Sequence, residues 1–192
     1  MTLKDRRETE TDVYQPAEDS HLLAEAVCDR FEASGDKLVL EVGTGSGYVA
    51  GYIAEETNAR VIASDLNPHA VRQAQGVGVE PVRADLVAPF ADGVFDVVAF
   101  NPPYLPTDPE TEWDDWMERA LSGGEDGRAV IDPFLESVGR VLAPEGVVYL
   151  LVSSLTGVEA VVEHAGKEGF SAVAVADESF PFETLTVLEL FQ

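Results

Sequence analysis

The sequence has few positive charges. Only 12 of its 192 residues are Lys or Arg, against 36 Asp and Glu, which gives a formal net charge of −24 at pH 7. Proteins that hold nucleic acid through its phosphate backbone present clustered cations. The shortage of cations therefore argues against passive nucleic-acid binding as the main function.

Cysteine and long apolar runs are also scarce. Cys28 is the only cysteine, which excludes an internal disulfide, and no Cys or His cluster has the spacing of a zinc site. No apolar run approaches the ~18 residues of a membrane span, and the first residues are too polar for a signal peptide. These absences predict a soluble protein of the reducing cytoplasm that holds no metal.

The acidity has two interpretations. In concentrated intracellular salt, screening removes the self-repulsion of a strongly acidic surface. Alternatively, a basic partner covers one acidic face. The first, halophilic interpretation is favoured because the acids are spread along the whole chain. The hydrophobic content of 45% supplies a core, and the length predicts one domain over residues 1–192.

Apolar runs alternate with helical patterns along most of the chain, which predicts βα units around a parallel sheet. Strands are expected at residues 37–42, 60–64, 80–84, 95–100, 146–153, 172–176 and 184–191. Helices are expected at residues 20–31, capped by Asp19 or Ser20, and at 48–56, 68–75, 131–141 and 157–168. Residues 177–183 are too few for a helical crossover, so the last two strands are expected to pair antiparallel. Residues 102–126 are expected to be irregular.

A glycine-rich turn follows the first strand. Gly43, Gly45 and Gly47 lie between residues 37–42 and the next predicted helix. Glycines let the backbone turn sharply and leave space for a ligand that the helix N–H groups can face. A nucleotide-like cofactor at this strand end is indicated. Tyr48 replaces the third glycine of the dinucleotide pattern, which disfavours NAD; a tight turn without a ligand is the alternative.

Acids stand at the ends of the next two strands. Asp65 ends the second strand, where its carboxylate can accept hydrogen bonds from ribose hydroxyls. Asp85 ends the third, where it or a neighbouring backbone group could meet an adenine amino group. Glycine, acid and acid at three successive strand ends predict a nucleoside site.

The segment Asn101-Pro102-Pro103-Tyr104 directly follows the buried strand 95–100. One interpretation is a strand terminator, since prolines stop ladder pairing and restrict the residue before them. A second is catalytic. The rigid backbone can hold the Asn101 side-chain oxygen and the Pro102 carbonyl as acceptors for one planar NH2 group, while Tyr104 packs on its flat face. Such acceptors would aim the nitrogen at an electrophilic methyl group.

These motifs together resemble the class I S-adenosylmethionine-dependent methyltransferases. The resemblance implies a Rossmann-like, mostly parallel seven-stranded sheet with a reversed last strand and helices on both faces. It also implies that cofactor-binding residues lie at the strand ends, namely Ser20, Glu41, Gly43, Gly45, Gly47, Asp65, Leu66, Asp85, Leu86 and Asn101.

Segments 12–20 and 120–134 resemble one branch, the HemK-type protein glutamine methyltransferases, in their compact archaeal and eukaryotic form. That resemblance implies N5-methylation of the glutamine in the Gly-Gly-Gln tip of a release factor, with residues 1–20 covering the cofactor. An Asn-Pro-Pro-Tyr segment also occurs in enzymes that methylate exocyclic amines of RNA or DNA bases, so such an enzyme is the alternative. A non-catalytic cofactor-binding scaffold is a third, weaker hypothesis.

The same branch works with a small zinc-binding activator subunit that extends the sheet by strand addition. The resemblance places that partner on the third strand, between Val79 and Ala84, and makes this chain the catalytic half of a heterodimer. Pro81 and Arg83 could instead blunt the edge. The acidic tract between Glu110 and Glu118 is interpreted as a solvated loop.

Overall fold

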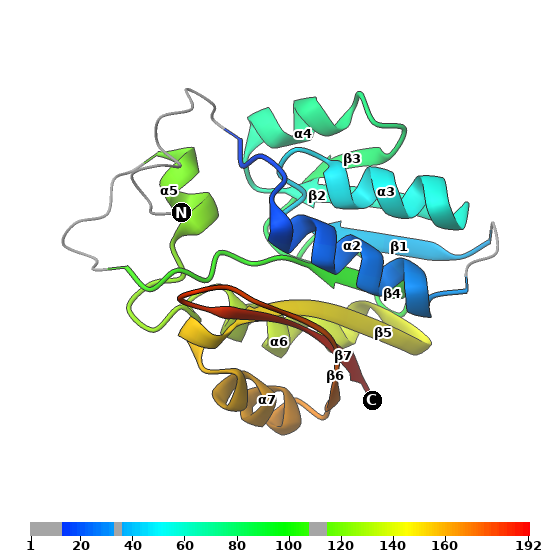
Figure 1. Cartoon of the computed structure of the whole chain (residues 1–192). Helices are drawn as coiled ribbons and strands as arrows, with labels where there is room; N and C mark the ends of the chain where they lie inside the picture. The colour runs from blue at the N-terminus through cyan, green and yellow to red at the C-terminus, as the bar shows by residue number, and fades with distance from the viewer. Residues whose placement is uncertain (1–12, 33–35, 108–114) are drawn as a thin grey trace.

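The computed structural model describes residues 13–32, 36–107 and 115–192 (Figure 1). One seven-stranded sheet has the order β3-β2-β1-β4-β5-β7-β6. Its strands are β1 (Leu38–Val42), β2 (Arg60–Asp65), β3 (Glu80–Arg83), β4 (Phe95–Phe100), β5 (Leu142–Ser153), β6 (Ser171–Ser179) and β7 (Thr184–Phe191). The first five strands pair parallel, and β7 runs antiparallel to β5 and β6. The predicted α/β fold with a reversed last strand is confirmed.

Helices cover both faces of the sheet (Figure 1). They are α2 (Glu18–Arg30), α3 (Tyr48–Thr57), α4 (Pro68–Ala74), α5 (Trp116–Leu121), α6 (Ile131–Val138) and α7 (Val158–Lys167), with the short 3-10 turns η1 (Gly139–Val141) and η2 (Ser154–Thr156). Helices α2, α3 and α4 lie over one face, and α6 and α7 over the other. In the described ranges, no helix has the length and apolar character needed to cross a bilayer.

Alternating side chains of β4 show why both faces are covered. Val97 and Ala99 join the buried cluster under α2 and α3, whereas Val98 and Phe100 join the cluster under α6 and α7. A strand sends successive side chains to opposite faces, so a continuous apolar run is the pattern of a strand buried on both sides. The run FDVVAF therefore specifies a central strand.

The strand order reverses direction at β1. This strand pairs with β2 on one side and with β4 on the other. Loops that leave two such strands at their carboxyl ends diverge and leave a crevice between them, which is where open α/β sheets bind ligands. The glycine turn after β1 and the Asn101 segment after β4 consequently meet at one point.

The predicted helix cap is wrong. Helix α2 begins at Glu18 and its N-cap is Ala17, which has no side-chain cap. Asp19 lies inside the first turn, nearly fully buried, where its carboxylate accepts hydrogen bonds from the Tyr14 hydroxyl (2.7 Å) and the Ser20 N–H (2.7 Å). Asp19 therefore fastens the segment before α2 instead of ending the helix.

Helix α5 was not expected, since residues 102–126 were predicted to be irregular. Asp115 caps it by accepting a hydrogen bond from the Glu118 N–H at 2.7 Å. Glu118 is only 7% exposed, so the interpretation of this end of the acidic tract as a solvated loop is wrong. Glu110, Glu112, Trp113 and Asp114 lie outside the described residues.

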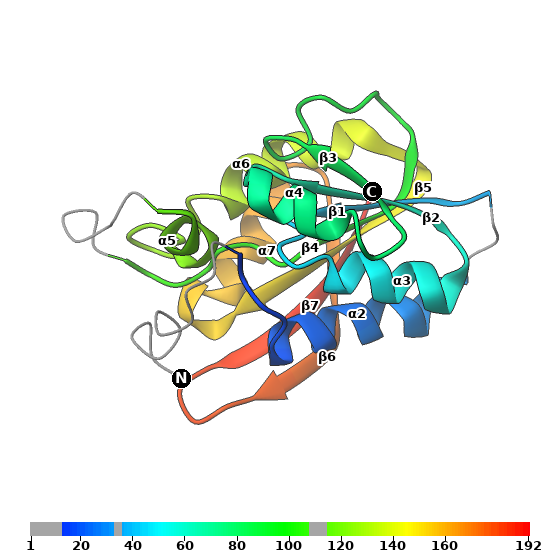
Figure 2. The ribbon, with the colours of Figure 1, turned by 90° about the horizontal axis from the view of Figure 1, so that it is seen from above.

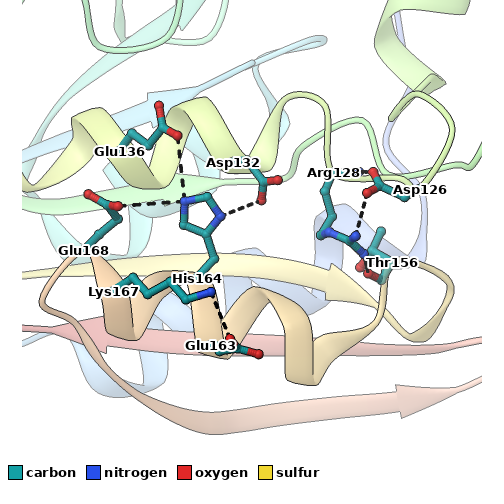
Figure 3. A network of polar contacts seen from close by, with 9 residues as sticks. All are labelled: Asp126, Arg128, Asp132, Glu136, Thr156, Glu163, His164, Lys167 and Glu168. Atoms are coloured by element: carbon teal, nitrogen blue, oxygen red, sulfur yellow. Dashed lines mark hydrogen bonds and ion pairs between the residues drawn. The ribbon is translucent and has the colours of Figure 1, made fainter.

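Helix α5 stands beyond the carboxyl ends of the strands and off both faces of the sheet, as the view from above shows (Figure 2). On the α6/α7 face, His164 links the two helices (Figure 3). Its ring lies 3.1 Å from the Asp132 carboxylate and 3.9 Å from the carboxylates of Glu136 and Glu168. His164 thus serves the packing of α7 on α6 and does not line the cavity described below.

Candidate active site

A cavity of about 450 Å³ opens at the carboxyl ends of the central strands. Its size lies within the roughly 300–1,000 Å³ typical of small-molecule sites. Twelve of the residues predicted from the sequence line it, namely Ser20, Glu41, Gly43, Gly45, Asp65, Leu66, Asp85, Leu86, Asn101, Pro102, Pro103 and Tyr104. The fold therefore brings together residues from five separate stretches of the chain.

Gly47 is the predicted site residue that does not line the cavity. It precedes α3 with φ of +85°, and a Cβ on it would lie 3.0 Å from a Val77 methyl and 3.2 Å from the Ala74 Cα. Its lack of a side chain therefore lets the start of α3 pack against the end of α4.

The glycine turn approaches its surroundings closely. Gly43 and Gly45 have φ of +66° and +53°, a region that L side chains rarely adopt. A Cβ on Gly43 would lie 3.2 Å from the Phe100 ring, and one on Gly45 would lie 3.4 Å from the Tyr14 carbonyl oxygen. The Gly45 N–H donates to the Asp65 carboxylate at 2.9 Å, so the turn is fixed to the end of β2.

Glu41 is a buried carboxyl group at the base of the cavity. It accepts hydrogen bonds from the Thr44 hydroxyl and from the Ala50 N–H, the latter at 3.0 Å. Burial raises the pKa of Glu41 to about 8, because these bonds only partly offset the loss of hydration. Without a nearby cation the side chain is largely protonated at neutral pH.

Asp65 is held rigidly at the end of β2. Its two carboxylate oxygens accept hydrogen bonds from the Gly45 N–H at 2.9 Å and the Asn67 N–H at 2.8 Å. Burial raises the pKa of Asp65, against the opposing effect of these backbone bonds. Each oxygen retains a further lone pair, so the carboxylate can accept hydrogen bonds from a ligand as well.

The far wall of the cavity comes from the ends of β2 and β3. Leu66 is 44% exposed although it is apolar, and it faces the cavity. Leu86 has φ of +46°, an unusual backbone conformation for a residue other than glycine. Asp85 is exposed beside it. An apolar wall with one carboxylate at its rim is suited to a flat heterocycle with an exocyclic amine.

The Asn101 side chain has an unpaired acceptor. Its Oδ1 is buried and accepts no hydrogen bond from any described residue. Buried polar atoms are nearly always paired, and an unpaired one costs on the order of 1–3 kcal/mol. The neighbouring Pro102 and Tyr104 are both buried, and all three residues line the cavity. Such an acceptor is free to receive an N–H from a ligand.

The backbone of residues 121–129 supports the Asn101 segment from behind. Leu105 forms a parallel bridge with Ser122, with hydrogen bonds from the Leu105 N–H to the Leu121 carbonyl (3.0 Å) and from the Gly123 N–H to the Leu105 carbonyl (2.9 Å). Gly127 has φ of +76°, and a Cβ on it would lie 2.6 Å from the Tyr104 carbonyl oxygen. The two segments are thus in direct contact.

Arg128 ties this support to η2 (Figure 3). Its guanidinium donates to the Thr156 carbonyl at 2.6 Å and to the Asp126 carboxylate at 2.5 Å. Sequence reasoning singled out segment 120–134 by resemblance only and assigned no contact to these side chains. The role of Arg128 in joining residues 121–129 to η2 was therefore not predicted.

The cavity is also lined by residues to which the sequence analysis assigned no individual ligand contact. Val13 and Tyr14 reach the cavity from before α2, and Trp116 and Arg119 reach it from α5. The Arg119 guanidinium lies 5.4 Å from the centre of the Trp116 ring. In the described part of the chain, no three His, Cys, Asp or Glu residues are grouped as a metal site would require.

Comparison with known proteins gives one consistent family. A family model described as a methyltransferase domain matches residues 39–122. A Methanocaldococcus jannaschii protein, provisionally named a protein N5-glutamine methyltransferase, is 35% identical and aligns over 94% of this chain and 92% of its own length. Human methyltransferase HEMK2 is 32% identical over 93% of this chain and 89% of its own length.

A solved structure adds a three-dimensional likeness. A chain of the E. cuniculi Mtq2-Trm112 complex, a complex described as responsible for methylation of the eRF1 translation termination factor, is 29% identical to this chain. It superposes with a TM-score of 0.78 over 95% of this chain and 99% of its own.

Proposed function

This chain belongs to the HemK2-type family of S-adenosylmethionine-dependent methyltransferases, and we propose that it methylates the side-chain amide of the glutamine in the Gly-Gly-Gln tip of a release factor. The observation that carries the proposal is the buried, unpaired Oδ1 of Asn101 in the wall of the cavity. An unpaired acceptor beside Pro102 and Tyr104 suits a planar NH2 group, which is what the amide presents.

The cavity fits the methyl donor by its chemistry. The carboxylate of Asp65 would accept hydrogen bonds from the ribose hydroxyls, and the glycine turn lets the methionine part approach the backbone. Glu41 would lose its proton beside the cofactor's ammonium group, because an opposite charge favours the ionised carboxylate. Leu66 and Leu86 would pack on the adenine, with Asp85 near its amino group.

When bound, S-adenosylmethionine supplies a sulfonium methyl that is already strongly electrophilic, so the protein does not need a side-chain nucleophile. We propose that Asn101 Oδ1 and the Pro102 carbonyl accept the two amide N–H bonds and that Tyr104 packs on the amide plane, while Pro103 stiffens the turn. Fixed acceptors would stabilise the positive charge that develops on the nitrogen as the carbon–nitrogen bond forms and the methyl–sulfur bond breaks, with S-adenosyl-L-homocysteine as the product that leaves. The amide proton then passes to water.

We propose that a small zinc-binding activator subunit adds a strand to β3, between Val79 and Ala84. Among the strands of the described residues, β3 stands at one end of the sheet and pairs with β2 alone. It is only four residues long, and Val77 just before it is 41% exposed. The unpaired backbone groups of an edge strand, with an exposed apolar side chain beside them, form a site for strand addition.

We further propose that residues 1–192 act as one methyltransferase domain, with residues 1–20 over the cofactor and Ser20 at the site. Tyr14 and Ser20 line the cavity in support of this. The single cysteine, Cys28, is compatible with a reducing cytosol, and the net charge of −24 with concentrated salt.

The proposal is tested by following the label of methyl-tritiated S-adenosylmethionine. The chain, with and without the activator in concentrated KCl, is offered either an archaeal or eukaryotic-type release factor or a total RNA preparation. The expected result is label on the release factor that depends on the activator. Label on RNA alone would instead identify a base methyltransferase, and full activity of a well-behaved lone chain would refute the heterodimer.

A further inference from the structure

The hairpin between β6 and β7 carries an unusually exposed aromatic side chain. Phe182, in the turn, is 89% exposed, and Leu155, in the adjacent η2, is 44% exposed. We call Phe182 and Leu155 together the hairpin surface. Exposed large apolar side chains on neighbouring elements can mark an interaction site.

The hairpin surface is held rigidly. The turn closes with a hydrogen bond from the Phe180 N–H to the Glu183 carbonyl at 2.7 Å. The hairpin is fastened to the end of β5, because the Ser153 hydroxyl donates to the Glu183 carboxylate at 2.7 Å and the Thr184 N–H donates to the Ser154 hydroxyl at 3.0 Å. These bonds order the backbone that carries Phe182, so binding there loses less backbone entropy than binding to an unordered turn would.

The hairpin surface lies at the same end of the sheet as the cavity, beyond the carboxyl ends of the parallel strands. Strand β7 is antiparallel to β5, and Ser153 pairs with Leu185 near the start of β7, so the turn projects beyond the carboxyl ends of the parallel strands. Strand β4 ends at Phe100, which pairs with Leu150, so the hairpin extends past the level of Asn101. Figures 1 and 2 show the hairpin turn and α5 projecting on this side.

A contact chain joins the hairpin surface to the active site. Thr156, next to Leu155, receives the Arg128 guanidinium at 2.6 Å. Gly127, next to Arg128, touches the backbone of Tyr104. A molecule seated on the hairpin surface is therefore beside the structure that supports the Asn101 segment.

Exposed acids lie on the elements next to the hairpin surface in the fold. Asp177 and Glu178 are exposed on β6 beside the turn, and Glu159 is exposed at the start of α7. The Asp126 side chain is 55% exposed, next to Arg128. Exposed apolar side chains on strongly acidic elements complement a partner whose apolar pocket has Lys and Arg near it.

We propose that the hairpin surface docks the body of the protein substrate, the domain that carries the glutamine, through an apolar pocket with a basic rim. This inference rests on the proposed function. A small cavity can hold one side chain, but a protein substrate must also be held by its surface, and Phe182 has the properties of an anchor for that contact. The hairpin surface thus contributes to substrate affinity without contacting the reacting atoms.

Phe182→Ala and Leu155→Ala, alone and together, test the proposal. Both side chains are exposed, so the variants should fold. The expected result is a KM for the release factor raised about tenfold or more in the double variant, with kcat at saturating substrate and the Kd for S-adenosylmethionine unchanged. Phe191→Ala is the matched control, because Phe191 is 38% exposed at the other end of the same strand; it should leave KM unchanged.

An unchanged KM in the double variant, with the wild type active, would overturn the docking proposal alone. Sedimentation of the double variant, with and without the activator, then identifies the occupant. Loss of activator binding, with KM unchanged, would assign the hairpin surface to the activator, and loss of self-association would assign it to a second copy of the chain. A wild-type protein that never labels the release factor would overturn the proposed function, and the docking proposal with it.

Discussion

At the scale of single residues, Asn101 is the side chain on which catalysis depends in this account. Replacement by Ala removes the unpaired acceptor and leaves the proposed cofactor contacts of Asp65 and the glycine turn in place. The expected result is a kcat lowered by about a hundredfold or more, with the Kd for S-adenosylmethionine changed little. Single-turnover methylation and calorimetric titration of the cofactor measure the two quantities.

A matched variant, Asp65→Ala, should have the opposite profile. It removes the carboxylate that fixes Gly45 and faces the ribose, so cofactor binding should be lost first. Retention of most of the turnover rate by Asn101→Ala would contradict the assigned role of the amide acceptor.

Glu41 predicts a specific dependence of stability on pH. Burial raises its pKa from 4.5 to about 8 in the folded protein, so the folded state retains a proton that the unfolded state releases. The stabilising effect of that proton is fully present below about pH 4.5 and is lost as the pH rises through about 8. In Glu41→Gln the side chain is neutral at every pH, so this pH-dependent loss of stability is absent.

The free energy of unfolding by urea, measured at constant KCl and without cofactor, checks this prediction. The free energy of unfolding of Glu41→Gln, relative to that of the wild type, should increase by a few kcal/mol between pH 5 and pH 9. This difference should level off above pH 8. Parallel pH profiles for the two proteins would show that Glu41 ionises normally. The Kd of Glu41→Gln for S-adenosylmethionine should rise, because the counter-charge to the ammonium group is absent.

At the scale of elements, the backing of the Asn101 segment by residues 121–129 predicts that Gly127→Ala impairs catalysis. Its Cβ would lie 2.6 Å from the Tyr104 carbonyl oxygen and 2.7 Å from a Thr156 methyl, at a φ of +76°. The segment must shift, and a misplacement of about 1 Å can cost on the order of a hundredfold in rate. Steady-state kinetics should show a lower kcat with cofactor affinity preserved.

Gly166→Ala is the control for this substitution. No atom lies within 4 Å of the Cβ that it would add, and it sits within α7, so both activity and stability should be maintained or improved. Equal kinetics for Gly127→Ala and wild type would mean that the support does not position the Asn101 segment.

Elements were predicted well where the pattern is local. The run FDVVAF and the glycine turn after β1 identify themselves by periodicity and by residue type. Helix α5 was missed because it is six residues long and lies in an acid-rich stretch, and its burial depends on contacts that no local pattern encodes. Asp19 was predicted to cap α2, whereas it accepts a hydrogen bond from the Tyr14 hydroxyl, a contact that local pattern did not indicate.

The candidate site was predicted for a topological reason. Parallel strands place their carboxyl ends along one edge, so acids and glycines at successive strand ends converge whatever the loops do. The arrival of Trp116 and Arg119 in the cavity depends on the placement of α5, which no local pattern encodes. Gly47 was predicted to contact the ligand, whereas the close packing of α3 against α4 explains why a glycine stands there.

At the scale of the whole molecule, the net charge of −24 predicts a strong dependence on salt. Arg30 pairs with Glu189 and Lys37 pairs with Asp96. Even if each of the 12 cations pairs with one acid, most of the 36 acids have no cation to neutralise them. Screening should reduce the self-repulsion of the folded state. The melting temperature is expected to rise with KCl over the range from dilute to molar.

Equal ionic strengths of KCl and tetramethylammonium chloride separate screening from ion-specific effects, since screening predicts the same rise in both. A melting temperature that is flat or falls with salt would contradict the halophilic interpretation and favour the alternative of a basic partner on one acidic face.

The central claim is that the acceptor is a glutamine amide, and its most direct test is to locate the methyl group. The chain and its activator are incubated with the release factor and S-adenosylmethionine in concentrated KCl, and the digested substrate is sequenced by tandem mass spectrometry. We predict one added methyl on the side chain of the Gly-Gly-Gln glutamine, and none with Asn101→Ala. A methyl group on another residue, or on RNA with the glutamine unmodified, would contradict it.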